Sequence, residues 1–208
     1  MFQKNPYKLN LFSKYSTHNI IIDNVGIDKT VLDVGCNDGY IGNNSDKSNN
    51  FYGVDYLEDS INKAKQSYKD AIVYDLNNLE NLPWNIKFDV IIFADVLEHI
   101  LYPEKVIDFF TKNYLKDNGR IIISLPNIAN WQVRLKLLFG KFDYKNTGIM
   151  DRTHLHLYTY KTALTFVSKF NLKTEKIVGG ASIFGLIISI FPFLKSLLAT
   201  NIIIIARK

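Results

Sequence analysis

The segment TVLDVGCNDGY, residues 30–40, constrains the fold of this chain more than any other part of it. Its first half is a short run of β-branched and apolar residues, which predicts a buried parallel strand. The turn at residues 35–39 contains two glycines, so the backbone there can approach a ligand without a Cβ in the way. About 17 residues later the run FYGVD ends in Asp55, and a carboxylate at the tip of a second strand typically holds the ribose hydroxyls of a nucleoside. The pattern therefore predicts an α/β domain that binds a nucleoside.

The glycine spacing in this turn indicates which nucleoside is bound. A dinucleotide fingerprint needs glycine at positions 37 and 40 as well as 35, and Asn37 and Tyr40 occupy the two later positions. The run VLDVGCNDG instead resembles motif I of the class I S-adenosylmethionine-dependent methyltransferases, with Asn37 in place of the usual middle glycine. The resemblance implies that S-adenosylmethionine is the cofactor. The motif residues expected to contact it are Asp33, Gly35, Cys36, Asn37 and Gly39.

Later segments extend the resemblance to about residue 127. In the family, the acid that ends the third strand accepts a hydrogen bond from the adenine amino group, and the next backbone N–H meets the ring. Asp75 and Leu76, at the end of AIVYDL, match these two positions. A fourth strand at residues 88–94 leads to Asp95, and NGRIIISLPN is a fifth strand introduced by an Asn-Gly turn. The further residues expected at the cofactor are Asp55, Tyr56, Asp75, Leu76 and Asp95.

Strand and helix patterns alternate about every 20 to 30 residues, which is typical of a doubly wound sheet. A sixth strand is expected at residues 171–178 and a seventh at 200–206. The predicted fold class is a three-layer α/β/α Rossmann-like sandwich with a mainly parallel seven-stranded sheet and an antiparallel last strand. A chain of 208 residues with 47% hydrophobic content can bury one sizeable core, so we expect a single domain over residues 1–208.

Composition restricts the expected partners. The net charge is +5, but the basic residues are interleaved with acids and no N-P-P-Y-type motif is present, so we expect no nucleic-acid partner. Cys36 is the single cysteine, which excludes an internal disulfide and fits a reducing compartment. The N-terminal run MFQKNPYKLNLF lacks a long apolar stretch. We therefore expect no cleaved signal peptide and a cytoplasmic location.

Residues 126–158 are too many for a simple connection between a strand and a helix, and predict a substrate-side insertion. They include an amphipathic stretch at residues 131–139. The elements PNIANW and DRTHLHLYT resemble those that flank the active site in a methyltransferase subgroup common among bacterial surface-polysaccharide and glycolipid gene products, with His156 where arginine is usual. We expect substrate contacts from Asn127, from Trp131, whose flat apolar face suits a sugar ring, and from Arg152, whose fork suits phosphate. His156 is a further candidate, although it replaces the arginine that would give a cationic contact.

Two histidines are candidates for the general base. Methyl transfer to a hydroxyl or ammonium group requires a proton acceptor, and histidine ordinarily titrates near neutral pH. His99 follows the fourth strand, close to where the methyl group of the cofactor should project. His154 lies in the insertion near Asp151, which can orient its ring. Catalytic roles are therefore predicted for His154, His99 and Asp151, with the choice between the two histidines open.

A metal site is the alternative use of the same region. Asp95, Glu98 and His99 have the i, i+3, i+4 spacing that places ligands on one helical face. The further acid and asparagine ligands of metal-dependent catechol-type methyltransferases are not recognisable, so we expect no metal.

Residues 179–198 are unusually apolar. Glycines, a proline and the strand expected after this segment argue against a transmembrane span. The segment is interpreted as a buried cover over the active-site mouth or, less favoured, as an interfacial helix at the inner membrane face. Peripheral membrane contact and a homodimer both stay open.

The predicted function is S-adenosylmethionine-dependent methylation of a hydroxyl or amine on a sugar, nucleotide sugar or glycolipid. One alternative is a quinone- or phenol-type small-molecule O-methyltransferase, which DVLEHI also resembles. The other alternative is a non-catalytic subunit that binds S-adenosylmethionine.

Overall fold

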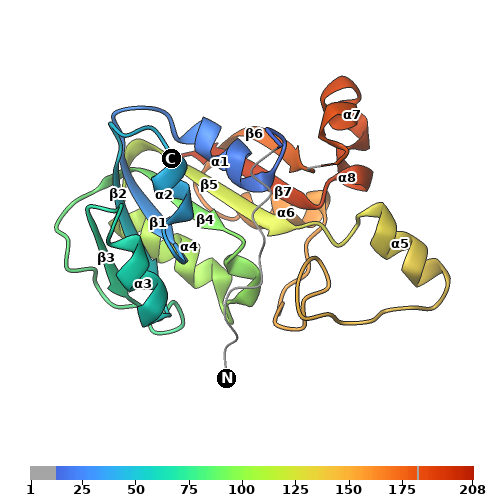
Figure 1. Ribbon diagram of the computed structural model, residues 1–208, viewed down its shortest axis with the longest axis horizontal. Coiled ribbons are helices and arrows are strands. Elements are labelled where there is room, and N and C mark those ends of the chain that lie inside the picture. Colours follow the sequence, from blue (N-terminus) through green and yellow to red (C-terminus); the bar gives the residue numbers. More distant parts are fainter. Residues whose placement is uncertain (1–12, 182) are drawn as a thin grey trace.

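One sheet runs through the computed structural model, which describes residues 13–181 and 183–208 (Figure 1). The strand order in the sheet is β3-β2-β1-β4-β5-β7-β6. The strands are β1 (Thr30–Val34), β2 (Asn50–Asp55), β3 (Asp70–Val73), β4 (Phe88–Ala94), β5 (Leu115–Pro126), β6 (Lys173–Gly180) and β7 (Asn201–Arg207). Neighbouring strands are parallel except where β7 pairs with β5 and with β6. The predicted mainly parallel sheet with an antiparallel last strand is therefore confirmed. The N-terminal run in which we expect no signal peptide lies outside the described residues.

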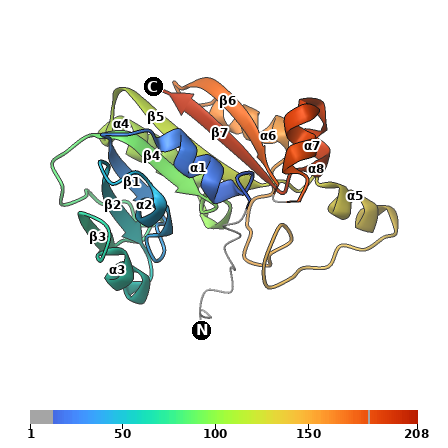
Figure 2. The same cartoon turned by 45° about the horizontal axis from the view of Figure 1, so that its top comes forward.

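Helices cover both faces of the sheet, as predicted (Figures 1 and 2). Alternation along β4 explains the two layers, because successive side chains of a strand point to opposite faces. Ile91 and Phe93 belong to one buried cluster, whereas Val90 and Ile92 belong to the other. The first face is covered by α4 (Pro103–Asn113) and α6 (Tyr160–Val167), and the second by α1 (Thr17–Val25), α2 (Tyr40–Asn44) and α3 (Glu58–Ala64).

Two strand boundaries differ from the sequence prediction. β3 ends at Val73, so Asp75 and Leu76 follow the strand instead of ending it. β5 begins at Leu115, before the predicted Asn-Gly turn. Asn118 has a left-handed φ of 61°, and the pairing of β4 with β5 shifts register in this region. The Asn-Gly pair therefore forms an irregularity within β5, not a turn that precedes it.

The insertion and the apolar segment lie together at one end of the molecule (Figures 1 and 2). The insertion contains α5 (Trp131–Leu138), and the apolar segment contains α7 (Gly185–Ile190), the 3₁₀ turn η2 (Pro192–Leu194) and α8 (Lys195–Leu198). The Trp131 and Phe184 ring centroids are 6.4 Å apart, which links the two segments.

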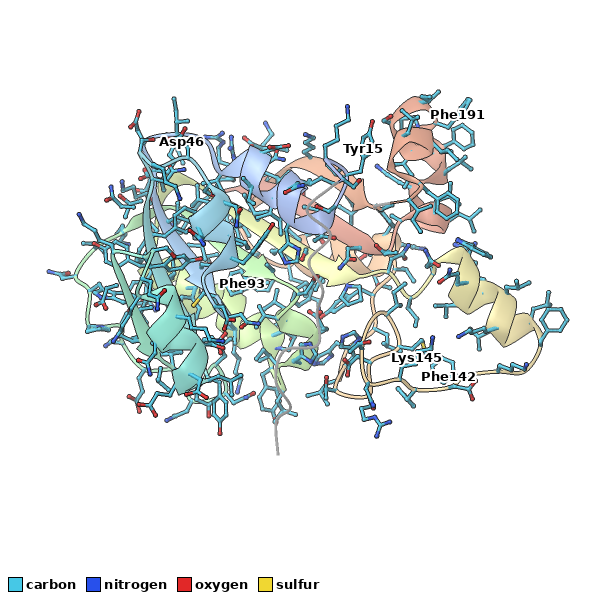
Figure 3. All side chains as sticks on the ribbon, viewed as in Figure 1. Tyr15, Asp46, Phe93, Phe142, Lys145 and Phe191 are labelled. Atoms are coloured by element: carbon cyan, nitrogen blue, oxygen red, sulfur yellow. The ribbon has the colours of Figure 1, made fainter. Side chains whose placement is uncertain are left out.

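The apolar segment is not the mostly buried cover favoured by the sequence. Large side chains of this segment are exposed, including Phe193 at 75% and Phe191 at 48% (Figure 3). Gly185 and Ile188 are the buried residues of α7. Within residues 13–181 and 183–208, no helix is long and apolar enough to cross a membrane.

Candidate active site

The candidate site lies at the carboxyl ends of β1 and β4. These two strands are neighbours in the sheet, although β2 and β3 separate them in sequence. Strand order reverses at this point, and ligands of doubly wound folds bind in the crevice that such a reversal creates. The turn at residues 35–39 follows β1, and residues 95–99 follow β4.

The turn after β1 has the backbone that its glycines predict. Gly35 and Gly39 both have a φ of 76°, and Asn37 has a φ of 46°. A Cβ on Gly35 would lie 2.7 Å from Cγ2 of Val96, and one on Gly39 would lie 2.9 Å from Cα of Ala64. Asparagine tolerates the left-handed region better than most residues, which explains how Asn37 replaces the usual middle glycine.

Asp55 holds this turn in place. One carboxylate oxygen accepts from the Asn37 N–H at 2.8 Å, and the other accepts from the Leu57 N–H at 2.9 Å. A carboxylate oxygen has a second lone pair, so both oxygens can still accept from ribose hydroxyls. Tyr56, the residue that follows Asp55 in the chain, is exposed. The turn and Asp55 therefore fit a nucleoside.

Asp33 lies deeper in the protein interior than its predicted contact with the cofactor would require. Its side chain is 1% exposed and accepts from the Tyr68 hydroxyl at 2.6 Å. Its other oxygen, Oδ1, has no hydrogen-bond partner among the described residues. Burial raises the pKa of Asp33 to about 7, against the opposing effect of the Tyr68 hydrogen bond. Because the Tyr68 hydroxyl also accepts from the Gly42 N–H at 3.2 Å, Asp33 supports the start of α2 through Tyr68.

Cys36 is a packing residue in the turn. Its side chain is buried, and burial raises the pKa of the thiol.

The acids that follow β3 and β4 have different surroundings. Asp75 is exposed, and its carboxylate accepts from the Asn77 N–H at 2.9 Å, while Leu76 is buried.

Asp95, which follows β4, has a left-handed φ of 52°. Its Oδ1 accepts from the Ser124 hydroxyl at 2.6 Å and from the Asn201 amide at 2.8 Å. Strands β5 and β7 therefore fix Asp95, and sequence reasoning did not identify either partner.

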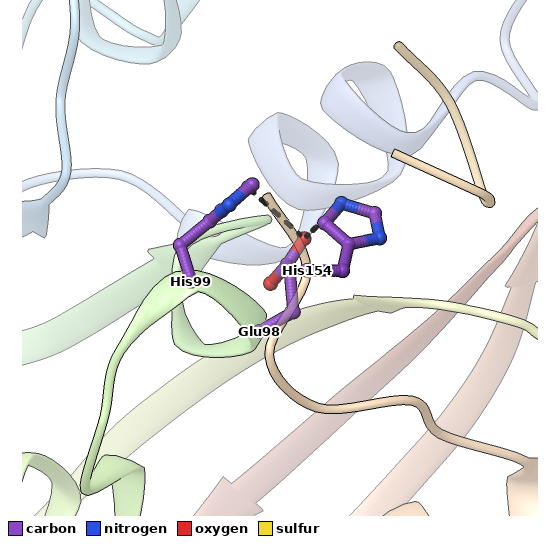
Figure 4. Close-up of side chains that lie close together, drawn as sticks. All are labelled: Glu98, His99 and His154. Atoms are coloured by element: carbon purple, nitrogen blue, oxygen red, sulfur yellow. Dashed lines mark ion pairs between the residues drawn. The ribbon is translucent and has the colours of Figure 1, made fainter. Parts of the chain in front are cut away.

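Glu98, His99 and His154 form a cluster just after β4 (Figure 4). We call these three residues the Glu98–His99–His154 cluster. Oε1 of Glu98 is 4.0 Å from Nε2 of His99 and 3.9 Å from Nε2 of His154. Glu98 and His99 belong to the 3₁₀ turn η1 (Leu97–His99), whereas His154 comes from the insertion. The sequence places Asp95, Glu98 and His99 on one face of a helix. In the structure Asp95 is not part of the cluster, because it precedes a 3₁₀ turn and its carboxylate is bound by Ser124 and Asn201.

The neighbours of the two rings fix their neutral tautomers. Nδ1 of His154 is 3.2 Å from the Ile149 carbonyl oxygen, which only accepts, so Nδ1 carries the proton. Nδ1 of His99 is 3.2 Å from the Thr153 carbonyl and 3.0 Å from the Thr153 hydroxyl. That hydroxyl donates its one proton to Asp151 at 2.7 Å, so it also accepts from His99. In both neutral rings Nε2 therefore bears a lone pair and faces Glu98.

Exposure distinguishes the two candidate bases. The His99 side chain is 32% exposed, whereas the side chains of His154 and Glu98 are 3% and 1% exposed. Burial lowers the pKa of His154, helped by the neighbouring His99. Burial also raises the pKa of Glu98 well above its usual value, with the Asp95 charge adding to the effect. His99 is therefore the more exposed of the two candidate bases. The Ile149 carbonyl, rather than Asp151 as predicted, hydrogen-bonds Nδ1 of His154.

The insertion is fastened over the cluster by backbone hydrogen bonds. The N–H groups of Leu155 and His156 donate to the Glu98 carbonyl at 2.8 and 3.2 Å. Nε2 of His156 is 3.0 Å from the Ile100 carbonyl, so this ring anchors the loop. Asn127 is fully buried, and its amide donates to backbone carbonyls beside α8 at 3.0 and 2.9 Å. Asn127 is therefore a structural anchor, in place of the substrate contact that the sequence predicts.

The remaining predicted substrate residues lie nearer the surface. Trp131 lines an open pocket of about 400 Å³ between α5 and α8. Arg134, Leu135, Leu138 and Leu197 complete this lining, which agrees with the predicted amphipathic face of α5. Arg152 is exposed in the loop that contains His154.

Comparisons with known proteins agree with this geometry. Residues 27–169 match the model of a methyltransferase domain family. A mitochondrial ubiquinone biosynthesis O-methyltransferase from Candida albicans is 33% identical over 107 residues, which are 47% of this chain and 32% of that protein. A ubiquinone biosynthesis O-methyltransferase from Glaesserella parasuis is 30% identical over 109 residues, which are 48% of this chain and 46% of that protein. This chain thus spans less than half the length of these two curated relatives.

Solved structures with a similar fold have low sequence identity. An S-adenosylmethionine-dependent methyltransferase from Mesorhizobium loti has a TM-score of 0.62 at 14% identity, over 93% of this chain and 98% of that one. The N-methyltransferase NodS from Bradyrhizobium japonicum, solved with S-adenosylhomocysteine, has a TM-score of 0.61 at 15% identity, over 94% and 85%. The family match and the fold together show that this chain belongs to the methyltransferase domain family and has the Rossmann-like fold of S-adenosylmethionine-dependent methyltransferases.

Proposed function

We propose that this domain transfers a methyl group from S-adenosylmethionine to a hydroxyl or amine of a sugar, in a glycan or a lipid-linked saccharide. The observation that carries the proposal is the position of the Glu98–His99–His154 cluster beside the turn that follows β1. Val96 lies so close to Gly35 that an added Cβ would clash with it, and Glu98 is two residues further on. Groups able to handle a proton therefore border the place where the turn fits a nucleoside.

Two strand ends support S-adenosylmethionine as the donor. Asp55 keeps lone pairs available for ribose hydroxyls, and Asp75 is exposed at the end of the neighbouring strand, where the family pattern holds the adenine amino group. The cofactor supplies a methyl group on a positively charged sulfur.

Methyl transfer also requires the acceptor to lose a proton. A bond forms between the acceptor oxygen or nitrogen and the methyl carbon, and the S–CH₃ bond breaks with its electron pair left on sulfur. The proton leaves through the Glu98–His99–His154 cluster, with His99 as its accessible member. Asp151 orients His99 indirectly, because it accepts the Thr153 proton that would otherwise compete at Nδ1.

The end of the molecule around α5 and α7 supports an acceptor that is carried by a lipid. We call the exposed apolar side chains there the apolar end surface (Figure 3). They are Leu135, Leu138, Phe139, Phe142, Leu186, Ile190, Phe191 and Phe193. Exposed apolar areas of this kind mark membrane or partner contacts. Basic residues, including Arg134, Lys136, Lys141, Lys145 and Lys195, occur on the same segments, which favours an anionic lipid surface.

A quinone- or phenol-type acceptor is the second candidate. It is favoured by the similarity to ubiquinone biosynthesis O-methyltransferases over about half of this chain. The open apolar pocket beside Trp131 suits an aromatic ring as well as an acyl chain.

Incubation of a cell extract with the protein and methyl-labelled S-adenosylmethionine distinguishes these acceptors. After solvent partition and mass spectrometry, we expect label on a saccharide, enriched in the lipid-linked fraction. Label on a phenol or quinone instead would support the second candidate. Binding of S-adenosylhomocysteine without labelling of any fraction would indicate a non-catalytic subunit and contradict the proposal.

His99→Ala should reduce labelling of the acceptor at least about a hundredfold. Asp117→Asn, at a 96% exposed side chain near the amino end of β5, is the matched control.

A further inference from the structure

The Glu98–His99–His154 cluster brings together three atoms that carry lone pairs, namely Oε1 of Glu98 and Nε2 of each histidine. The neutral tautomers place a lone pair on Nε2 of both rings, because each Nδ1 proton is donated to a backbone or hydroxyl oxygen. Both Nε2 atoms point to Oε1 of Glu98. Three electron-rich atoms that converge in this way repel one another unless a positive charge lies between them.

Glu98 adds an independent observation. Its carboxylate is 1% exposed, and neither oxygen has a hydrogen-bond partner among the described residues. Buried carboxylates are normally paired, hydrogen-bonded or bound to a metal. The two imidazole Nε2 atoms lie 3.9 and 4.0 Å from Oε1 of this carboxylate, too far for hydrogen bonds. Glu98 therefore lies close to both rings but makes no hydrogen bond to either of them.

We propose that the cluster binds a divalent transition-metal ion of the zinc type, through Nε2 of His99, Nε2 of His154 and the carboxylate of Glu98. Two imidazoles and one carboxylate are ligands that zinc and its neighbours in the first transition row prefer, whereas magnesium and calcium prefer oxygen ligands. The sequence suggests Asp95, Glu98 and His99 as a possible ligand set. In the structure His154, from the insertion, takes the place of Asp95 in this set.

The distances require only a small contraction. The three ligand atoms lie within 4.8 Å of one another. Ligand atoms of a tetrahedral zinc site are about 3.3 Å apart, given bond lengths of about 2.0–2.1 Å. Shifts below about an ångström per side chain would close this difference. The carbonyls of Ile149 and Thr153 already hold the two Nδ1 atoms, which is the outer-shell arrangement usual for metal-bound histidines.

Exposure of the cluster on the His99 side gives the ion an open position. Catalytic zinc sites have three protein ligands and keep a fourth position for water or substrate. The use of that position rests on the proposed function: the acceptor hydroxyl binds the ion through oxygen, its pKa falls, and its proton leaves to solvent. The oxygen then takes the methyl group from sulfur, and the electron pair of the S–CH₃ bond stays on sulfur. With the ion bound, His99 is a ligand, and the ion replaces it as the group that promotes loss of the acceptor proton.

Metal binding by the purified full-length protein tests the proposal without any assumption about the acceptor. Zn²⁺ is titrated against a chromophoric chelator, and Co²⁺ binding is followed by its visible absorption. We expect one ion per chain and a cobalt spectrum of low coordination number. His154→Ala and Glu98→Gln should each weaken zinc affinity at least about a hundredfold, whereas the exposed Asp117→Asn should leave it unchanged.

Circular dichroism and binding of S-adenosylhomocysteine verify that each variant is folded. Because His154 and Glu98 are buried, the more exposed His99→Ala provides a second test, with the same loss of zinc affinity expected. Wild-type protein that binds no zinc, or His99→Ala with wild-type affinity for zinc, would overturn the proposal. The cluster would then be explained by a proton that the three residues share. Zinc binding without methyl transfer to any acceptor would support the metal site and refute the proposed function instead.

Discussion

Replacement of Asp33 by asparagine should change how the stability of the fold depends on pH. The Asp33 side chain is 1% exposed, and burial raises its pKa from 3.8 to about 7. In the unfolded chain this carboxyl loses its proton near pH 4, whereas in the folded protein it keeps the proton to about pH 7. Between these values the folded state binds more protons, so the free energy of unfolding falls as pH rises.

The size of the effect follows from the same two pKa values. At ~1.4 kcal/mol per pH unit, a rise from 3.8 to about 7 corresponds to a loss of ~4 kcal/mol between acid and neutral pH. Asparagine has nearly the same shape and can still accept from the Tyr68 hydroxyl, but it does not ionise. The stability of Asp33→Asn relative to wild type should therefore rise through this range and become constant above about pH 7.

Urea unfolding of the ligand-free protein, followed by tryptophan fluorescence from about pH 4.5 to 8.5, measures this difference across most of the interval between the two pKa values. Asp117→Asn, at an exposed site, is the control and should show no such trend. A stability difference between Asp33→Asn and wild type that does not change with pH would refute the reasoning. It would mean that the buried carboxylate stays ionised in the fold.

Three further substitutions test the site and its supports. Asp55→Ala should weaken S-adenosylhomocysteine binding by roughly 2–4 kcal/mol in calorimetry, because charge-assisted hydrogen bonds are lost; unchanged affinity would exclude Asp55 from the site. Gly39→Val should lower the free energy of unfolding by about 2 kcal/mol or more in urea titrations, because φ is positive and an added Cβ would lie 2.9 Å from Ala64; wild-type stability would contradict this. Asn127→Ala should lower it by about 1–3 kcal/mol without changing cofactor affinity, and a selective loss of affinity would assign Asn127 to the site.

The sheet and the turn after β1 could be predicted because their signals are local. Apolar runs of strand length identified six parallel strands and the last antiparallel one to within a few residues, and the two glycines marked the left-handed turn. The role of Asp55 at the turn also follows from its place at a strand end. Its hydrogen bond to the Asn37 N–H crosses from β2 to that turn because β1 and β2 are neighbours.

The cluster could not be predicted as a unit, since it depends on contacts between distant parts of the chain. His154 reaches Glu98 because the insertion folds back and donates two backbone hydrogen bonds to the Glu98 carbonyl. The left-handed φ of Asp95 and the 3₁₀ turn after it are also not evident from the sequence. The i, i+3, i+4 spacing of Asp95, Glu98 and His99 predicts a common face only if the segment is an α-helix. Likewise, the deep burial of Asp33 depends on Tyr68, 35 residues away.

A crystal structure of the protein with S-adenosylhomocysteine tests the central claim most directly. The ribose should lie against the Asp55 carboxylate, the adenine beside Asp75 and Leu76, and the thioether sulfur should point toward the Glu98–His99–His154 cluster. Density for the ligand in that orientation would confirm that the proton-handling groups border the transferred methyl group. Density at another place, or a sulfur directed away from His99, would contradict the account.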